Sequence, residues 1–254
     1  MCAGLCYGSA PEVPHEVTTA AIVLRSVDYG EADRIVTLLT ESRGCVAAIA
    51  RGARRSRRRF GGALEPFAVL EVDLALQRGE LQRLGAARVV RSCLGILGDL
   101  AKLEAAGQAL TFVRGVLTEA GGEPELYHEA VALLLALDLS PSDQAERLRQ
   151  AFATRVLALS GWEPDLQRCG FCERVPRPTQ PVEFDPQRGH LVCRSCGGGP
   201  VGLAAQARAF LVAMAASGVA GAADWDLPVP VAGQVERALQ ELLRCHVPKF
   251  ASRG

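Results

Sequence analysis

Four of the nine cysteines form two pairs with the spacing of a metal site. The first pair is Cys169-x-x-Cys172 and the second, after an interval of twenty residues, is Cys193-x-x-Cys196. Each Cys-x-x-Cys turn directs two thiolates to the same side, and two such turns facing each other supply four sulfur ligands in a tetrahedron. The spacing therefore predicts one Zn²⁺ per chain, held by Cys169, Cys172, Cys193 and Cys196.

A site with four cysteine ligands has no open coordination position, so we expect a structural metal and not a catalytic one. A zinc deaminase would need the motifs His-x-Glu and Pro-Cys-x-x-Cys, and the sequence contains neither. His190 lies three residues before Cys193 and is an alternative ligand, but we expect a histidine in a surface turn. Residues 182–192 fit a hairpin that turns at 185–189.

The remaining five cysteines are scattered along the chain. An odd total with one clustered quartet indicates a reducing compartment and a metal site, not a disulfide framework. Cys45 and Cys93 fall on apolar positions, and we expect both to be buried.

Residues 51–60 carry six arginines and no acidic residue, although the whole chain balances 28 Lys+Arg against 28 Asp+Glu. Such a local excess of positive charge predicts an anionic partner that docks at one place, and arginine binds phosphate in bidentate fashion. A solvated loop without a partner is the alternative. The six arginines are Arg51, Arg54, Arg55, Arg57, Arg58 and Arg59.

Aromatic side chains are scarce around this stretch: Tyr29, Phe60 and Phe67 are the only ones between Val17 and Arg91. Proteins that bind single strands without sequence preference stack bases on aromatic rings. We therefore expect phosphate contacts to dominate, with similar tolerance of single and double strands. Six contacts to a single strand predict a slope of about −4 in log K against log salt.

The elements that position these residues differ between the two halves of the chain. Five short β-rich segments precede residue 92, and the arginines lie between the third and the fourth. Such spacing fits a closed five-stranded barrel of the oligonucleotide-binding type, and an SH3-like barrel fits it almost as well. The segments are 17–27, 34–40, 45–50, 67–76 and 81–90.

After Ser92 the apolar period becomes helical. Residues 94–117 predict one long or broken helix that stops at Gly121-Gly122, and a third helix is expected to start at Ser140-Pro141 and end at Ser160-Gly161. The other helices are expected at 125–137, 203–216 and 231–245. The apolar run 201–223 contains Gln206 and Arg208, so it predicts a buried helix and not a membrane span.

The totals, 254 residues with 49% apolar and 22% charged, fit two modest domains. Residues 1–16 have no cationic start or long apolar core, so we expect a disordered tail and not a signal peptide. No Walker loop or Gly-x-Ser-x-Gly motif occurs, and we interpret Asp28, Glu31 and Asp33 as a solvated turn.

Several segments together resemble one family, the bacterial recombination mediator RecO. They are Ile22-Val23-Leu24-Arg25, then Asp28-Tyr29-Gly30-Glu31-Ala32-Asp33-Arg34 with the following Ile35 to Thr40, then Ala50-Arg51-Gly52-Ala53-Arg54-Arg55-Ser56 leading to Leu64-Glu65-Pro66-Phe67, and Gly161-Trp162-Glu163-Pro164-Asp165-Leu166. Their order and separation carry the resemblance from about Val17 to Cys196. The tail before residue 17 and the lysine-poor stretch 245–249 depart from the family pattern.

This resemblance implies an α+β protein with an oligonucleotide-binding barrel at 17–91 and a helical domain at 92–254, into which a zinc module is inserted at 165–200. It implies that DNA is bound by Arg34 together with Arg51, Arg54, Arg55, Arg57, Arg58 and Arg59. It also assigns the structural metal to the four paired cysteines.

The family function implied is that of a cytoplasmic, nucleoid-associated mediator without catalysis. It binds single- and double-stranded DNA, anneals complementary strands and, with RecR, assists RecA loading on strands covered by single-strand-binding protein. Two alternatives come from other classes. One is a zinc-containing RNA-binding barrel protein of the translation apparatus, and the other is a zinc-dependent hydrolase or deaminase acting on nucleic acid.

Overall fold

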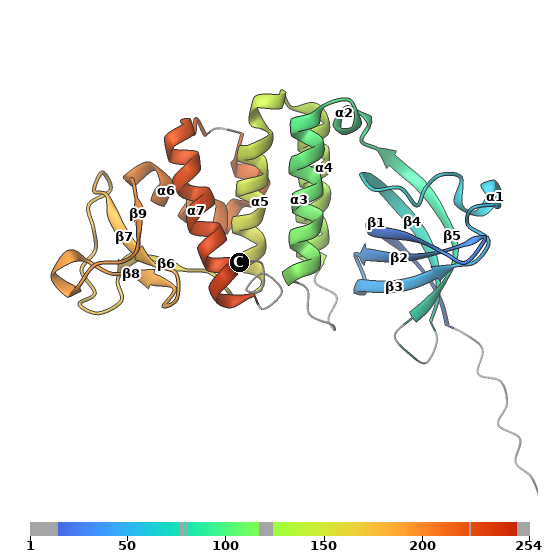
Figure 1. Ribbon diagram of the computed structural model, residues 1–254, viewed down its shortest axis with the longest axis horizontal. Coiled ribbons are helices and arrows are strands. Elements are labelled where there is room, and N and C mark those ends of the chain that lie inside the picture. Colours follow the sequence, from blue (N-terminus) through green and yellow to red (C-terminus); the bar gives the residue numbers. More distant parts are fainter. Residues whose placement is uncertain (1–14, 77–78, 80, 117–123, 224, 248–254) are drawn as a thin grey trace, which may run out of the picture.

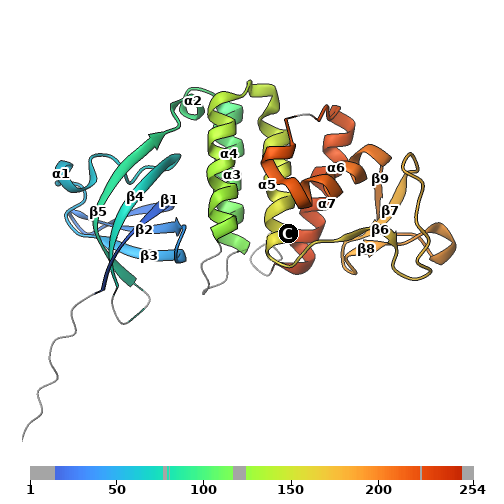
Figure 2. The same ribbon diagram turned by 180° about the vertical axis from the view of Figure 1, so that it is seen from behind.

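The computed structural model describes residues 15–76, 79, 81–116, 124–223 and 225–247. A β-barrel lies at one end of the elongated molecule, a group of helices occupies the middle, and a small sheet lies at the other end (Figure 1). The view from behind shows the same three regions in line (Figure 2). The first fourteen residues of the predicted tail and the predicted stop at Gly121-Gly122 lie outside the described residues.

Five strands form the barrel, as the β-rich segments predict. They pair in the closed order β1-β2-β3-β5-β4. Every pairing is antiparallel except that of β3 with β5, which is parallel and joins Ala47 to Leu81. The strands are β1 (His15–Tyr29), β2 (Asp33–Thr40), β3 (Gly44–Ala50), β4 (Ala68–Leu76) and β5 (Leu81–Ser92).

The first strand is longer than the sequence indicates. It begins at His15, because its backbone pairs with β4 as far as Leu76, so Glu16 belongs to a strand and not to the expected tail. Inward-facing positions alternate with outward-facing ones along the barrel strands, and small and branched apolar side chains fill the interior. Val36, Leu38 and Leu74 are among those completely buried there.

The arginine stretch is not a loop throughout, which corrects the expectation. After turns at residues 51–55, a one-turn helix, α1 (Arg57–Phe60), forms and ends at Gly61, whose φ of 44° is left-handed. Phe60 is 2% exposed and packs with Ala63 and Leu64 into the barrel core. Phe60, the one large apolar side chain of the stretch, therefore holds the cationic segment against one end of the barrel, and the smaller Ala53 packs against the same core.

Within the described residues, six α-helices of unequal length follow: α2 (Leu94–Leu97), α3 (Leu100–Val116), α4 (Pro124–Leu139), α5 (Ala145–Leu159), α6 (Ala205–Ser217) and α7 (Val229–His246). The first predicted helix is thus broken, at Gly98 and Asp99. The third begins later than predicted, because Pro141 is extended and a 3₁₀ turn, Ser142–Gln144, precedes α5. The helix ends at Leu159, close to the predicted end at Ser160-Gly161, and Gly161 has a left-handed φ of 79°.

The apolar stripe of α5 is buried at Leu148, Phe152 and Val156, whereas Leu159 is half-buried. One continuous apolar core joins the regions: it runs from Ile22 on the outer face of the barrel through the helices. In the described part of the chain no helix is both long and apolar enough to cross a membrane.

A four-stranded sheet, ordered β6-β8-β7-β9, follows α5. The predicted hairpin is confirmed, because β7 and β8 are antiparallel and pair Phe184 with Leu191. Phe184 and Leu203 extend the apolar core into this sheet. The strands are β6 (Asp165–Cys169), β7 (Val182–Asp185), β8 (His190–Leu191) and β9 (Val201–Leu203).

Candidate metal centre and candidate nucleic-acid interface

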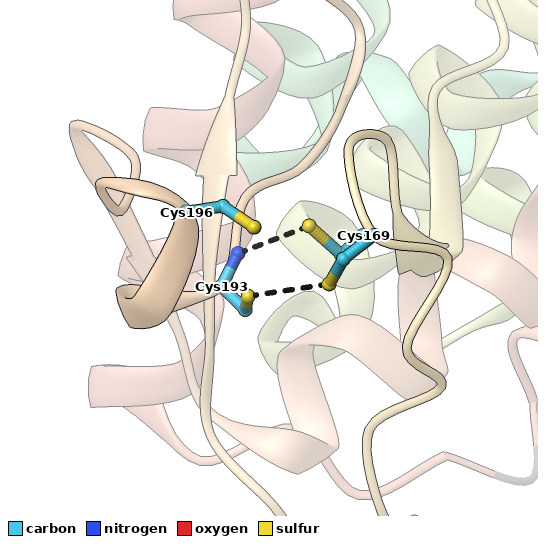
Figure 3. A group of neighbouring side chains, drawn as sticks. Cys169, Cys193 and Cys196 are labelled. Atoms are coloured by element: carbon cyan, nitrogen blue, oxygen red, sulfur yellow. Dashed lines mark hydrogen bonds between the residues drawn. The ribbon is translucent and has the colours of Figure 1, made fainter.

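The four paired cysteines converge at the edge of the small sheet. Their Sγ atoms all lie within 4.8 Å of one another, and none of the four is in a disulfide. The sulfurs of Cys172 and Cys193 are 3.6 Å apart. Figure 3 shows the side chains of Cys169, Cys193 and Cys196 directed toward a common point. Two turns far apart in the sequence thus supply four donors to one place.

Two tight turns direct the thiols inward. Cys169 ends β6, and the next turn closes through a hydrogen bond from the Glu173 N–H to the Cys169 carbonyl at 2.9 Å. In the second turn, the Cys196 N–H donates to the Cys193 carbonyl at 2.8 Å. The Cys193 N–H also donates to the Cys169 sulfur at 3.4 Å, which ties one turn to the other (Figure 3).

Two glycines that follow the second cysteine turn occupy positions where a side chain would be strained or would collide with the backbone. Gly197 has a φ of 110°, a left-handed conformation that L side chains rarely adopt. A Cβ atom on Gly199 would lie 2.7 Å from the backbone of Phe184. Because backbone atoms of a paired strand cannot move away cheaply, only glycine fits this position.

The surroundings of the four thiols favour ionisation at some of them. Hydrogen bonds from the N–H groups of Cys193, Cys172 and Phe171 lower the pKa of Cys169 to about 6. The Ser195 hydroxyl, at 3.1 Å, lowers the pKa of Cys193. Hydrogen bonds with the neighbouring thiols of Cys193 and Cys172 raise the pKa of Cys196 to about 12. Four crowded thiols cannot all ionise without a cation to compensate the charge.

The donor set fits a metal ion. A tetrahedral ion with Zn–S bonds of about 2.3 Å places its sulfurs about 3.8 Å apart. The observed 3.6 Å between Cys172 and Cys193 is close to that value and far above the length of a disulfide, about 2.05 Å. The arrangement can therefore hold a metal ion with four sulfur ligands, leaving no open position.

His190 lies outside the quartet, as expected, but it is not a plain surface residue. Its side chain is half-buried, and its ring meets the Phe171 ring edge-on with centroids 5.5 Å apart. A Cβ on Gly170 would lie 2.3 Å from the His190 ring. The histidine thus packs over the first cysteine turn and supports it from outside.

Of the two scattered cysteines that we expected to be buried, only one is. Cys93 is 1% exposed, and burial raises the pKa of its thiol. Cys45 is exposed, which corrects the prediction. Because side chains alternate along β3, Ala48 and Ala50 point into the barrel while Cys45 points outward.

The arginines of residues 51–60 lie on the surface around the α1 end of the barrel. Arg51, Arg54, Arg55 and Arg58 are exposed, Arg59 is half-buried, and the side chain of Arg57 is outside the described part. The Gly52 N–H donates to Asp33 Oδ1 at 2.7 Å, and the Arg54 N–H donates to the Ala32 carbonyl at 3.0 Å. The cationic segment is thereby fastened to the β1–β2 turn.

Carboxylates accompany three of the predicted arginines, a feature that sequence analysis missed. The Nε atom of Arg34 lies 3.0 Å from Asp28, and its Nη1 atom lies 2.7 Å from Glu65. Arg54 lies 3.7 Å from Asp28. The β1–β2 turn is thus not simply solvated: its acidic side chains pair with the cationic surface.

The third pairing joins Arg55 to Glu31, with Nη2 and Oε2 3.7 Å apart. The crowding of Asp28, Glu31 and Asp33 was a signal in the sequence. Arg34 is only six residues from Asp28, but Arg54 and Arg55 lie more than twenty residues from their carboxylate partners. Within the described residues, no salt bridge reaches Arg51, Arg58 or Arg59.

Arg59 has internal partners of another kind. Its Nη2 donates to the Arg51 carbonyl at 2.7 Å, and its Nε donates to Ser56 Oγ at 3.3 Å. Its guanidinium carbon lies 5.1 Å from the centre of the Phe60 ring. Arg59 therefore helps to shape the segment, whereas Arg51 and Arg58 extend from it.

The barrel offers little aromatic surface, as predicted. Tyr29 is 56% exposed, but Phe60 is buried and Phe67 is half-buried. A stacked row of bases would find one exposed ring near the arginines. The arrangement is suited to contact with a chain of phosphates and poorly suited to reading bases.

Comparisons with known proteins give a consistent result. Residues 15–93 match the family described as recombination protein O, N terminal, and residues 97–253 match recombination protein O, C terminal. The DNA repair protein RecO of Anaeromyxobacter dehalogenans (strain 2CP-C) is 40% identical over 235 residues, which cover 91% of each chain.

Two further relatives carry the same name. The DNA repair protein RecO of Geobacter sulfurreducens is 38% identical over 186 residues, 72% of this chain and 74% of the relative. That of Myxococcus xanthus is 38% identical over 179 residues, 70% of this chain and 71% of the relative. The family match over residues 15–93 includes the arginine segment, and the family match over residues 97–253 includes the four cysteines.

Proposed function

Because the chain belongs to the RecO family, we propose that it acts in DNA repair and recombination. The observation that carries the proposal is the coverage: the two family matches account for residues 15–93 and 97–253. Within that role, we propose a mediator that binds single- and double-stranded DNA and anneals complementary strands. With RecR it would assist RecA loading where single-strand-binding protein covers the strand.

The DNA surface that we propose is the arginine end of the barrel. Five strands with a parallel β3–β5 closure and a short helix between β3 and β4 support an oligonucleotide-binding fold over 17–91. The proposed phosphate contacts are Arg34, Arg51, Arg54, Arg55, Arg57, Arg58 and Arg59. Positive charge on an exposed surface, with few aromatic rings, supports affinity without choice of sequence.

For the remainder of the chain, 92–254, we propose a helical domain that meets protein partners and carries the inserted module 165–200. The four cysteines would hold one Zn²⁺ as a structural ion. When bound, the ion would neutralise the thiolates and join the two turns. Since all four positions would be filled by sulfur, this site gives no support to a hydrolase or deaminase.

Fluorescence anisotropy with labelled DNA and RNA strands of equal length, each at two salt concentrations, tests the proposal. We expect DNA to bind with an affinity that falls steeply as salt rises, because phosphate contacts release counterions. Binding of RNA alone would favour the RNA-binding barrel instead. The chain should anneal complementary strands at the salt concentrations at which it binds DNA, and fluorescence quenching on annealing measures this.

A further inference from the structure

The acidic side chains around the β1–β2 turn form ion pairs with arginines that, in the proposed DNA-binding surface, would contact phosphate. Glu31 lies 3.7 Å from Arg55, and Asp28 lies 3.7 Å from Arg54. Both acidic side chains are accessible to solvent: that of Glu31 is 93% exposed. A phosphate approaching either arginine would meet a negative charge at the same place.

Arg34 is held more tightly than the other two. It lies between Asp28 and Glu65, both of which raise its pKa through hydrogen bonds and charge, with Glu65 the larger cause. Its side chain is 27% exposed. One carboxylate, that of Asp28, is thus shared by Arg34 and Arg54.

Asp33 has a different role, although it belongs to the same turn. Its Oδ1 atom accepts the Gly52 N–H at 2.7 Å and so holds the backbone of the arginine segment. Loss of this hydrogen bond would disturb the segment itself. The Glu31 carboxylate has no such function: it pairs with the side chain of Arg55, whereas the backbone carbonyl of Glu31, which a change of side chain retains, accepts a hydrogen bond from Arg54 Nη1 at 3.4 Å.

Exposed ion pairs of this kind are weak, because water screens them and two long side chains must be ordered. Their carboxylates can therefore be displaced by an anion that brings several charges together. A nucleic-acid backbone brings a row of phosphates and can also reach Arg51 and Arg58, whereas an isolated phosphate cannot.

We infer that Asp28 and Glu31 are specificity-determining residues of the cationic surface, whose carboxylates compete with backbone phosphates for Arg54 and Arg55. They lower the affinity for every polyanion and favour one with several adjacent phosphates. The inference rests on the proposed nucleic-acid binding and adds to it a competing group that is part of the chain.

Glu31→Gln is the cleanest test, because glutamine keeps the shape and removes the charge. An exposed ion pair contributes about 0.2 to 1 kcal/mol, so the affinity for a labelled single-stranded oligodeoxynucleotide should rise about 1.4- to 5-fold at low salt. Asp28→Asn should act in the same direction. The gain should shrink as salt rises, because screening weakens the competition.

Glu16→Gln is the matched control, with the same change of charge on the same barrel. Glu16 is exposed near the start of β1, and Glu31 follows the end of that 15-residue strand. At about 3.3 Å per residue the strand between them spans roughly 40 Å, about four Debye lengths at 0.1 M salt, so at that salt concentration Glu16→Gln should change the affinity much less than Glu31→Gln. An equal rise in both variants would show a general effect of net charge and overturn the inference.

Two further outcomes separate the inference from its premise. If the unaltered chain binds DNA, and Arg58→Ala weakens that binding, but Glu31→Gln leaves the affinity unchanged or lowers it, then only the competition is wrong. If the unaltered chain binds no DNA at low salt, both the proposed function and this inference are overturned. Circular dichroism spectra of the variants should match that of the unaltered chain, since Glu31 is not buried.

Discussion

The cysteine module and the arginine segment were both conspicuous in the sequence, but their side chains are arranged differently in the structure. The four cysteines meet within 4.8 Å, and each is placed by a tight turn of its own backbone. The arginines spread over a surface, and three of the seven proposed contacts pair with carboxylates from other segments. One site is closed by local geometry and the other is open and adjustable.

This difference follows from the chemistry of each group. A metal ion needs donors at fixed bond lengths, so the spacing of the ligands in the sequence must satisfy a narrow geometry. Phosphate is attracted over several ångströms and tolerates many arrangements of arginine, so the sequence constrains only the number of charges. The residues next to each arginine in the sequence do not indicate which arginines form ion pairs with carboxylates.

Removal of the metal should destabilise the protein more than any of the following substitutions, and it tests whether the four cysteines bind the metal together. We expect one zinc per chain by elemental analysis, and its loss in Cys169→Ser. Structural zinc contributes about 10 to 16 kcal/mol of apparent binding energy in small peptides, so the variant should lose the order of the module 165–200. Limited proteolysis should then cut this module before the barrel.

Cys245→Ser serves as the control, since Cys245 is exposed in α7 and outside the quartet. It should retain the zinc. Because Phe184 and Leu203 belong to the core shared with the helices, chelation should also lower the melting temperature of the helical region. A full zinc content in Cys169→Ser would contradict the proposed ligand set.

The arginine segment should depend on its large apolar anchor, Phe60, more than on any single charge. Phe60→Ala removes a buried ring from the end of the barrel and should cost about 3 to 5 kcal/mol of unfolding free energy. Urea denaturation measures this loss. Phe171→Ala, at a ring that is 56% exposed, should cost far less. Equal losses would mean that the segment is not anchored through Phe60.

Neutralising four of the arginines tests the open surface itself. Replacing Arg54, Arg55, Arg57 and Arg58 by alanine should reduce the slope of log K against log salt by about 3, since each contact to a single strand contributes about 0.7. Anisotropy titrations at several salt concentrations give the slope. An unchanged slope would exclude this segment as the DNA contact.

The control for that variant removes the same number of charges elsewhere. Suitable positions are four exposed arginines in β6, in the 3₁₀ turn Arg194–Cys196 and in α7, in regions that lie far from the barrel (Figure 1): Arg168, Arg194, Arg237 and Arg244. Their replacement should leave the slope nearly unchanged. A similar fall in slope would indicate that DNA also follows the opposite end of the molecule.

The smallest effect is expected at His190. His190→Ala should keep one zinc per chain, because the histidine packs against Phe171 outside the quartet. Loss of this aromatic contact should lower the unfolding free energy by about 0.5 to 1.5 kcal/mol. A lower zinc content would mean that the histidine supports the ligands more directly than its position indicates.

Periodicity predicted the regular elements well, because alternation and helical stripes reflect burial that any compact arrangement of the chain requires. The errors lie where tertiary contacts override local preference. Phe60 turned a predicted loop into a helical turn by packing into the barrel. Pro141 remained extended, so α5 started at Ala145.

Four features could be predicted from the sequence: the cysteine quartet, the five strands, the order of barrel and helices, and the family. These depend on spacing along the chain, which covalent geometry carries directly into structure. Tertiary contacts, in contrast, bring Arg54 to Asp28, Arg55 to Glu31 and Arg34 to Glu65, and they make Phe60 the anchor of the cationic segment. Those outcomes join segments far apart in the chain, and long-range electrostatic and packing contacts leave no periodic signal in the sequence.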